Sequence, residues 1–335
     1  MFENKTRIFS NPLGFLAAVF LMGLVAGCVT VSEQKNVLQV KDVKVTAFTE
    51  MQFAPVVLEQ VQALTLDGDS PTFLFSEGKS YYAAVSLPAA IQTRYLSYQS
   101  NISGVPLNLV NALIPRFAFL DQAKQLLGTA VATQHHRKNG DFFQGTSFLG
   151  RVQVPPSAAY VVIYASEKIE ETLFVPANYG KKWPLALAPS GSLNFSVTTQ
   201  AVATMSDSWF FESSKKAQLF MVTEVDGQSI QNSDTESSSL SKGAGARLFI
   251  AITTRDVPAK PLKLKLVATH ITGAPIHGLF SQAVGTFYSV NGVVDFTPTA
   301  GGKYVVKGIL KKEGSSVWIE DEVTGQVVTE KVVER

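Results

Sequence analysis

The chain has 335 residues, a length that suits two domains of ordinary size. Hydrophobic residues make up 46% and charged residues 17%, proportions that exclude an intrinsically disordered chain. A formal net charge of +2 without a basic stripe argues against a nucleic-acid partner. The single cysteine excludes a disulfide within the chain.

The amino terminus has the order of a secretory signal. Lys5 and Arg7 precede an apolar run at residues 13–25, and small residues follow it. The run is shorter than the roughly 20 residues that a membrane-spanning helix needs. Residues 1–27 are therefore predicted to be a signal peptide.

The end of this signal, Leu24-Val25-Ala26-Gly27-Cys28, resembles the lipobox of bacterial lipoproteins. The resemblance implies diacylation of the Cys28 thiol, cleavage between Gly27 and Cys28, and acylation of the new amino group. Val29 occupies the position where an Asp usually implies inner-membrane retention, so the expected location is the periplasmic face of the outer membrane. The alternatives are an ordinary cleaved signal or a short uncleaved anchor, with a coincidental cysteine.

Behind the signal, residues 28–52 are predicted to be a tether, and residues 53–200 a β-rich domain of short apolar segments between turns. Continuous apolar runs at 117–120 and 160–164 predict strands buried on both faces. Alternation at 193–198 predicts a strand with one wet face. Short helices are expected within 107–113 and at 166–174.

Several of these segments resemble the MalM family over about residues 55–200. They are Asp69-Ser70-Pro71, Gly78 to Pro88, Pro115 to Gln122, Tyr160 to Lys168 and Pro176 to Lys181. MalM is the periplasmic product of the maltose operon, so the resemblance implies an accessory role in maltodextrin transport. It supplies no catalytic or ligand residues. The family continues with a Pro/Ala-rich linker and a helical tail, whereas this chain continues with more β pattern.

Residues 201–216 are predicted to be a linker, in which Trp209-Phe210-Phe211 docks between domains. In residues 217–335, Asp226-Gly227 and Asn291-Gly292 predict hairpins, and 233–245 a mobile loop. Short strands at regular spacing predict an immunoglobulin-like sandwich with Trp318 in its core. The expected fold class is thus mainly β, with two β-sandwich domains in tandem.

The sequence gives no pattern for catalysis. It contains no G-x-S-x-G, and Gly78-Lys79-Ser80 supplies only the end of a phosphate-loop motif, so a turn is expected there. The acids Glu170-Glu171 and Glu320-Asp321-Glu322 are expected to be solvated. We therefore predict no catalytic residues and no cofactor.

The four histidines do not predict a metal site. His135 and His136 are adjacent, so on a strand they would point to opposite sides, and a solvated loop tip is expected. His270 and His277 lack a nearby third ligand.

Aromatic residues near loops offer a candidate sugar platform, with Tyr179 and Trp183 as the ligand-binding candidates and Tyr95 and Tyr98 beside them. The expected function is that of a non-enzymatic lipoprotein, membrane-held through its lipid, that assists carbohydrate transport or binding. Its expected partner is a maltodextrin or a transport protein. The alternative is a structural or assembly lipoprotein that docks other envelope proteins without a sugar ligand.

Overall fold

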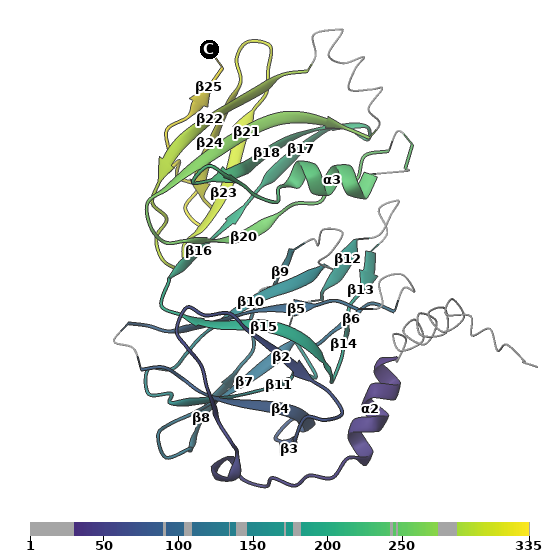
Figure 1. The fold of residues 1–335 in the computed structure, drawn as a ribbon. Helices are drawn as coiled ribbons and strands as arrows, with labels where there is room; N and C mark the ends of the chain where they lie inside the picture. The colour runs from purple at the N-terminus through teal and green to yellow at the C-terminus, as the bar shows by residue number, and fades with distance from the viewer. Residues whose placement is uncertain are drawn as a thin grey trace, which may run out of the picture.

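Strands dominate the computed structural model, in which two β-rich domains follow one another (Figure 1). The structure describes residues 30–334 except 90–91, 104–108, 134, 139–145, 171, 177–181, 242–243, 246 and 274–286. The helical elements of these residues are α2 (Val31–Val40), η1 (Phe48–Glu50) and α3 (Ser233–Ser241). A mainly β fold, with β-sandwich-like packing, is therefore confirmed.

Two main sheets build the first domain, in the orders β1-β4-β11-β7-β8, with β3 beside β4, and β2-β15-β5-β10-β9. Two small pairs, β12-β13 and β14-β6, complete it. The strands are β1 (Ala54–Pro55), β2 (Gln62–Leu66), β3 (Thr72–Phe75), β4 (Gly78–Ser86), β5 (Tyr95–Asn101), β6 (Asn111–Ala112), β7 (Pro115–Leu120), β8 (Leu126–Ala130), β9 (His135–Lys138), β10 (Ser147–Gln153), β11 (Tyr160–Ala165), β12 (Phe174–Pro176), β13 (Lys182–Pro184), β14 (Ala186–Leu187) and β15 (Gly191–Thr198).

Both main sheets contribute to one hydrophobic cluster. Leu96 of β5 and Leu193 of β15 meet Phe117 of β7 and Ile163 of β11 there, all fully buried. The other face of β7 and β11 is buried as well, in a second cluster, which confirms the expectation from their continuous apolar runs. On β15, burial alternates over residues 192–197 as expected.

The segment before β1 is not a free tether, which corrects the prediction for residues 28–52. Leu38 of α2 is buried in the first-domain core, and Met51 lies in the second cluster with Phe48 packed against it. Lys41 Nζ donates hydrogen bonds to the backbone oxygens of Gly68 and Ser70. A few apolar side chains are thus enough to dock this mostly polar segment, because they pack against the hydrophobic clusters that contain residues of β7 and β11.

Two sheets also build the second domain, in the orders β20-β16-β23-β24-β25 and β17-β18-β21-β22, with β19 beside β18. The strands are β16 (Val202–Ser206), β17 (Ser208–Ser213), β18 (Lys216–Val225), β19 (Gln228–Ser229), β20 (Thr254–Pro258), β21 (Leu262–Thr272), β22 (Ser289–Phe296), β23 (Lys303–Ile309), β24 (Ser316–Asp321) and β25 (Val332–Val333). Buried side chains of both sheets form one cluster, among them Met205, Leu264 and Val306. An immunoglobulin-like kinship stays a prediction.

The predicted linker at 201–216 is wrong, because it forms β16 and β17 and begins β18. β16 lies inside one sheet, between β20 and β23, and β17 is the edge of the other. Trp209, Phe210 and Phe211 do not dock between the domains either: they expose 44%, 61% and 41% of their surface on β17.

The Asn291-Gly292 hairpin is also wrong, since both residues lie within the continuous strand β22. There Gly292 pairs with Leu266 of β21, and a Cβ on Gly292 would lie 2.7 Å from Val332 Cγ1. The glycine thus permits close approach of the chain near β25. The Asp226-Gly227 hairpin is confirmed, with φ of 50° and 79° between β18 and β19.

Three other expectations are corrected. Residues 233–241, expected to be part of a loop, form α3, and no helix forms at the described residues of 166–174. Trp318 is buried away from the main cluster, with Lys331 Nζ 4.2 Å from its ring centroid, because its neighbours on β24 take the inward positions.

Candidate functional site: the cleft between the domains

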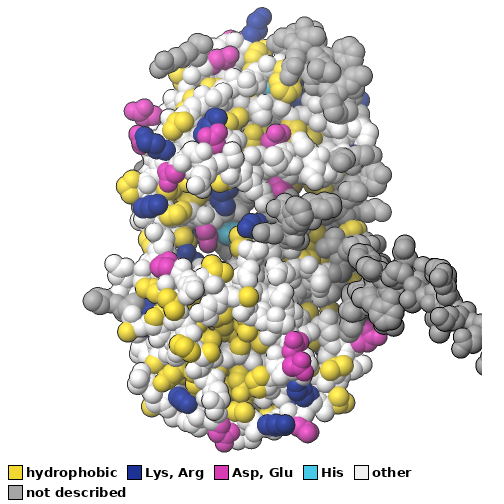
Figure 2. Space-filling view, viewed as in Figure 1, with side chains coloured by type: hydrophobic (Ala, Val, Ile, Leu, Met, Phe, Trp, Pro, Cys, Tyr) yellow, Lys and Arg dark blue, Asp and Glu magenta, His cyan; other side chains and the backbone are white. Residues whose placement is uncertain are grey.

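The cleft lies where β9 and β10 of the first domain approach β16 and β20 of the second. It contains two hollows of about 430 and 410 Å³, and His136 and Asp256 line both of them. Their volumes fall in the range of small-molecule sites. Figure 2 shows a histidine and charged side chains of both signs at the level where the domains meet.

β9 directs its two histidines to different neighbours. His135 Nε2 lies 2.6 Å from the hydroxyl of buried Tyr98, whereas His136 Nε2 lies 3.2 Å from Asp256 Oδ1 across the cleft. The expected loop tip is therefore wrong, because His135 to Lys138 form a strand paired with β10. The His136–Asp256 contact divides the cleft into a polar and an apolar hollow.

The polar hollow is lined by Tyr95, Arg151, Gln153, Thr204 and Asp256, together with other residues. The Arg151 guanidinium carbon lies 4.3 Å from the centroid of the Tyr95 ring, and Arg151 donates a hydrogen bond to the backbone oxygen of Gln200. Burial lowers the pKa of Arg151, while the charge of Asp256 acts in the opposite direction. The hollow therefore offers guanidinium donors, carboxylate acceptors and an aromatic ring within one space.

Glu59 fixes the chain that crosses from β15 to β16 beside this hollow. Its Oε1 accepts hydrogen bonds from the Thr199 backbone at 2.8 Å and the Thr198 hydroxyl at 2.9 Å. The backbone hydrogen bond from Thr199 is the main reason that the pKa of Glu59 is lowered. The crossing, and with it the start of β16, is thus held in place.

The second hollow is mainly apolar. Its lining includes the side chains of Leu149, Val225, Ile230, Val257 and Pro258. Arg137 and Lys138 of β9 also line it. The two hollows therefore differ in chemistry although one contact separates them.

Asp207, between β16 and β17, organises the second domain's side of the cleft. Its buried carboxylate accepts hydrogen bonds from Arg255 Nη1 at 2.9 Å and Nη2 at 2.8 Å. The other donors are the Ser233 hydroxyl at 2.8 Å, the Ser233 backbone at 3.0 Å and the Val222 backbone at 3.2 Å. Asp207 thereby fixes the start of α3 and the position of β20.

From this position α3 reaches the first domain. Glu236 of α3 is buried and forms an ion pair with Arg137 of β9. When one partner of an ion pair is buried, removing the other partner lowers the stability strongly, because the buried charge loses its counter-charge. This contact ties the two domains together on the apolar side of the cleft.

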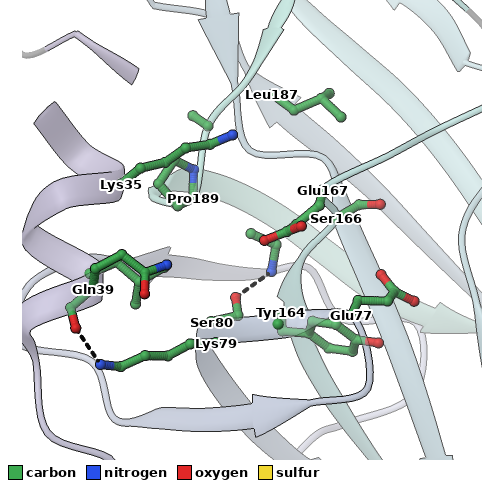
Figure 3. Close-up of a pocket in the computed structure, with 14 residues that line it drawn as sticks. Lys35, Gln39, Glu77, Lys79, Ser80, Tyr164, Ser166, Glu167, Leu187 and Pro189 are labelled. Carbon is green, nitrogen blue, oxygen red and sulfur yellow. Dashed lines mark hydrogen bonds between the residues drawn. The ribbon is translucent and has the colours of Figure 1, made fainter. Parts of the chain in front are cut away.

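A separate small cavity lies beneath α2 (Figure 3). Its volume is about 50 Å³, enough for water but not for a larger ligand. Lys79 reaches from β4 to the backbone oxygen of Gln39 in α2 at 2.9 Å, and the turn expected at 78–80 lies instead at 76–77. Tyr164, which lines the cavity, is buried with its ring stacked on Phe75 at 3.7 Å, and burial raises its pKa. The residues around this cavity hold α2 against the first domain.

The described residues of the predicted sugar platform do not come together. Trp183, on β13, is half-buried against the cluster that holds Val110 and Ile114, and it is not in the lining of either hollow. Tyr98 is buried. Of the three that the structure describes, Tyr95 alone lines the cleft; Tyr179 lies outside the described residues, as do Gly27 and Cys28.

Both ring nitrogens of His270 have partners within the second domain. Its Nε2 lies 2.7 Å from Glu212 Oε1, and its Nδ1 lies 3.1 Å from the Tyr288 backbone nitrogen. Burial favours a raised pKa for Glu212, but hydrogen bonds from Gln218, Lys216 and His270 outweigh it and lower the pKa. His277 lies outside the described residues, and among those described no three His, Cys, Asp or Glu side chains gather as metal ligands.

No family model matches the chain, and no curated protein is similar to it. Within the described part of the chain, no helix has both the length and the apolar character to cross a membrane.

Proposed function

We propose that the protein is a non-enzymatic lipoprotein, similar to the MalM family, that binds a carbohydrate such as a maltodextrin between its domains. Its anchor is a lipid on Cys28, and its place is the periplasmic face of the outer membrane. There it assists transport of the sugar, alone or with a transport protein. The lipobox at residues 24–28 supports the anchor.

The observation that carries the binding role is the polar hollow. Sugars present hydroxyl groups that both donate and accept hydrogen bonds, and the faces of their rings are apolar. Arg151 supplies donors, Asp256 supplies acceptors and Tyr95 supplies a ring in this space of about 430 Å³. These groups come from both domains, so a ligand there would also bridge them.

Thermal unfolding of the mature chain in detergent, with increasing maltoheptaose, tests this function. A ligand that binds the native state stabilises it by about 2.7 kcal/mol at a hundred times its dissociation constant, so the melting temperature is expected to rise. Arg151→Met is expected to abolish the rise. Arg247→Met, an exposed arginine outside both hollows, is the matched control and is expected to keep it. No rise with maltoheptaose or any other sugar would contradict the proposal.

A second function, docking of other envelope proteins, is favoured by β17. This edge strand exposes Trp209, Phe210 and Phe211 side by side along the chain. Exposed apolar groups on an edge strand are typical of protein interaction sites. Specific photo-cross-linking of one envelope protein from position 210, together with no response to sugars, would favour this function over the first.

A further inference from the structure

The helix α2 is a fixed part of the first domain. Leu38 is buried in the core, and the Ser190 hydroxyl donates a hydrogen bond to Gln34 Oε1 at 3.0 Å. At the amino end, Thr30 and Glu33 form a capping box, in which each side chain bonds the backbone of the other. Thr30 therefore has a defined position on the surface of the domain.

The chain between this position and the proposed anchor is very short. Cys28 precedes Thr30 by two residues, which span at most about 7 Å when fully extended. Val37 lies about 10 Å further along the helix axis, at 1.5 Å per residue. Lipid held by Cys28 would therefore bring the membrane surface to α2 itself.

The outer side of α2 suits such a surface. Val37 and Val40 lie three residues apart, and so on one side of the helix, and they expose 53% and 84% of their surface. In Figure 1, α2 lies at the margin of the first domain, with the sheets on one side of it only. Exposed apolar side chains on one side of a surface helix fit the boundary between lipid head groups and acyl chains.

We infer that the outer face of α2 rests on the lipid bilayer, so that the first domain is mounted directly on the membrane. This inference rests on the proposed lipid anchor at Cys28. It replaces a long flexible tether with a contact surface formed by Val37 and Val40. The partner of this surface is the lipid, not a protein.

Site-specific fluorescence on the mature lipoprotein tests the inference. Cys28 is the chain's only cysteine, and acylation consumes its thiol, so Val40→Cys provides one reactive site. The labelled protein is reconstituted in liposomes of phosphatidylethanolamine and phosphatidylglycerol, with nitroxide quenchers on some head groups. Gln122→Cys, exposed in the turn between β7 and β8 across the domain from α2, is the matched control.

We expect loss of most of the fluorescence at position 40 and little change at position 122. Acylated, liposome-bound protein with equal fluorescence at both positions would overturn the inference and leave the anchor intact. An unacylated protein would instead carry a second label at Cys28 and would not float with liposomes. That result would overturn the proposed anchor and the inference together.

A linker variant tests the argument from chain length. A long Gly/Ser insertion between Val29 and Thr30 is expected to restore fluorescence at position 40, because it lets the domain move away from the lipid. Acylation, checked by intact mass, is expected to be unchanged. Quenching that persists in the acylated variant would overturn the role of the short connection.

Discussion

Asp207 carries more of the second domain's structure than its place in the sequence suggests. It lies between two strands in a stretch of Ser, Thr and aromatic residues, yet its buried carboxylate binds Arg255, Ser233 and Val222. These partners lie on β20, α3 and β18, so three elements depend on one side chain. The residues next to Asp207 in the sequence do not predict this role, because its hydrogen-bond partners are 15 or more residues away along the chain.

Asp207→Asn is expected to lower the free energy of unfolding by about 3 kcal/mol. The amide removes the charge that pairs with Arg255 and places a donor among donors, and breaking a buried pair costs about 3–5 kcal/mol. Urea denaturation measures the change.

Asp295→Asn is the control for this variant. Asp295 pairs with Lys263 at 3.1 Å, but 83% of its side chain is exposed, so a change below about 1 kcal/mol is expected. Equal effects of the two variants would show that the Asp207 pair has no special weight.

At the scale of elements, the sequence predicted which strands are buried. It did not predict which segments of the chain cover them. The run at 117–120 correctly predicted a strand buried on both faces, because any cover satisfies that pattern. The cover itself, which includes Phe48 and Met51, was missed because these residues stand apart in a polar stretch.

Local turn signals failed where long-range pairing outweighed them. Asn291-Gly292 favours a hairpin, but β22 pairs with β21 along its whole length and keeps the chain extended. The apolar run Trp209 to Phe211 predicted packing between the domains, but its strand β17 is the edge of a sheet and pairs on one side with β18. Asp226-Gly227 succeeded because the strands that it joins do pair.

Leu38→Ala tests whether α2 is docked in solution. The leucine is buried in the first-domain core, and such truncations cost about 2–5 kcal/mol. Urea denaturation is expected to show a loss of at least about 2 kcal/mol.

Val40→Ala, on the exposed side of the same helix, is expected to stay within about 0.5 kcal/mol of the parent. A similarly small effect of Leu38→Ala would mean that the helix is detached, and the bilayer contact would lose its support.

At the scale of the whole molecule, the candidate site belongs to neither domain alone. Arg151 is on β10 and Asp256 on β20, strands that different sheets of different domains contribute. The alternation of residues along β10 assigns Arg151 to one face of its sheet. The local sequence does not show which face the other domain will cover. The sequence could therefore propose aromatic candidates, and among those that the structure describes Tyr95 alone lines the cleft.

The Arg137–Glu236 pair is expected to couple the stabilities of the two domains. Arg137→Ala leaves buried Glu236 without this guanidinium, and a loss of about 3 kcal/mol is expected. Adding Glu236→Ala is expected to cost less than the sum of the single changes, and calorimetry of all four proteins measures the coupling.

Single-variant losses that add within about 0.5 kcal/mol would show that the pair does not link the domains. A single calorimetric transition that separates into two in Arg137→Ala would support the link directly.

The short crossing at residues 199–201 determines how this protein can be dissected. A fragment that starts at Ala217 would lack β16, the strand between β20 and β23, and its sheet would be left with a gap. A fragment that ends at Lys216 would carry β16 and β17 with no sheet to join. Independent halves therefore require a cut between Thr198 and Val202, and only such halves would report the folding of each part faithfully.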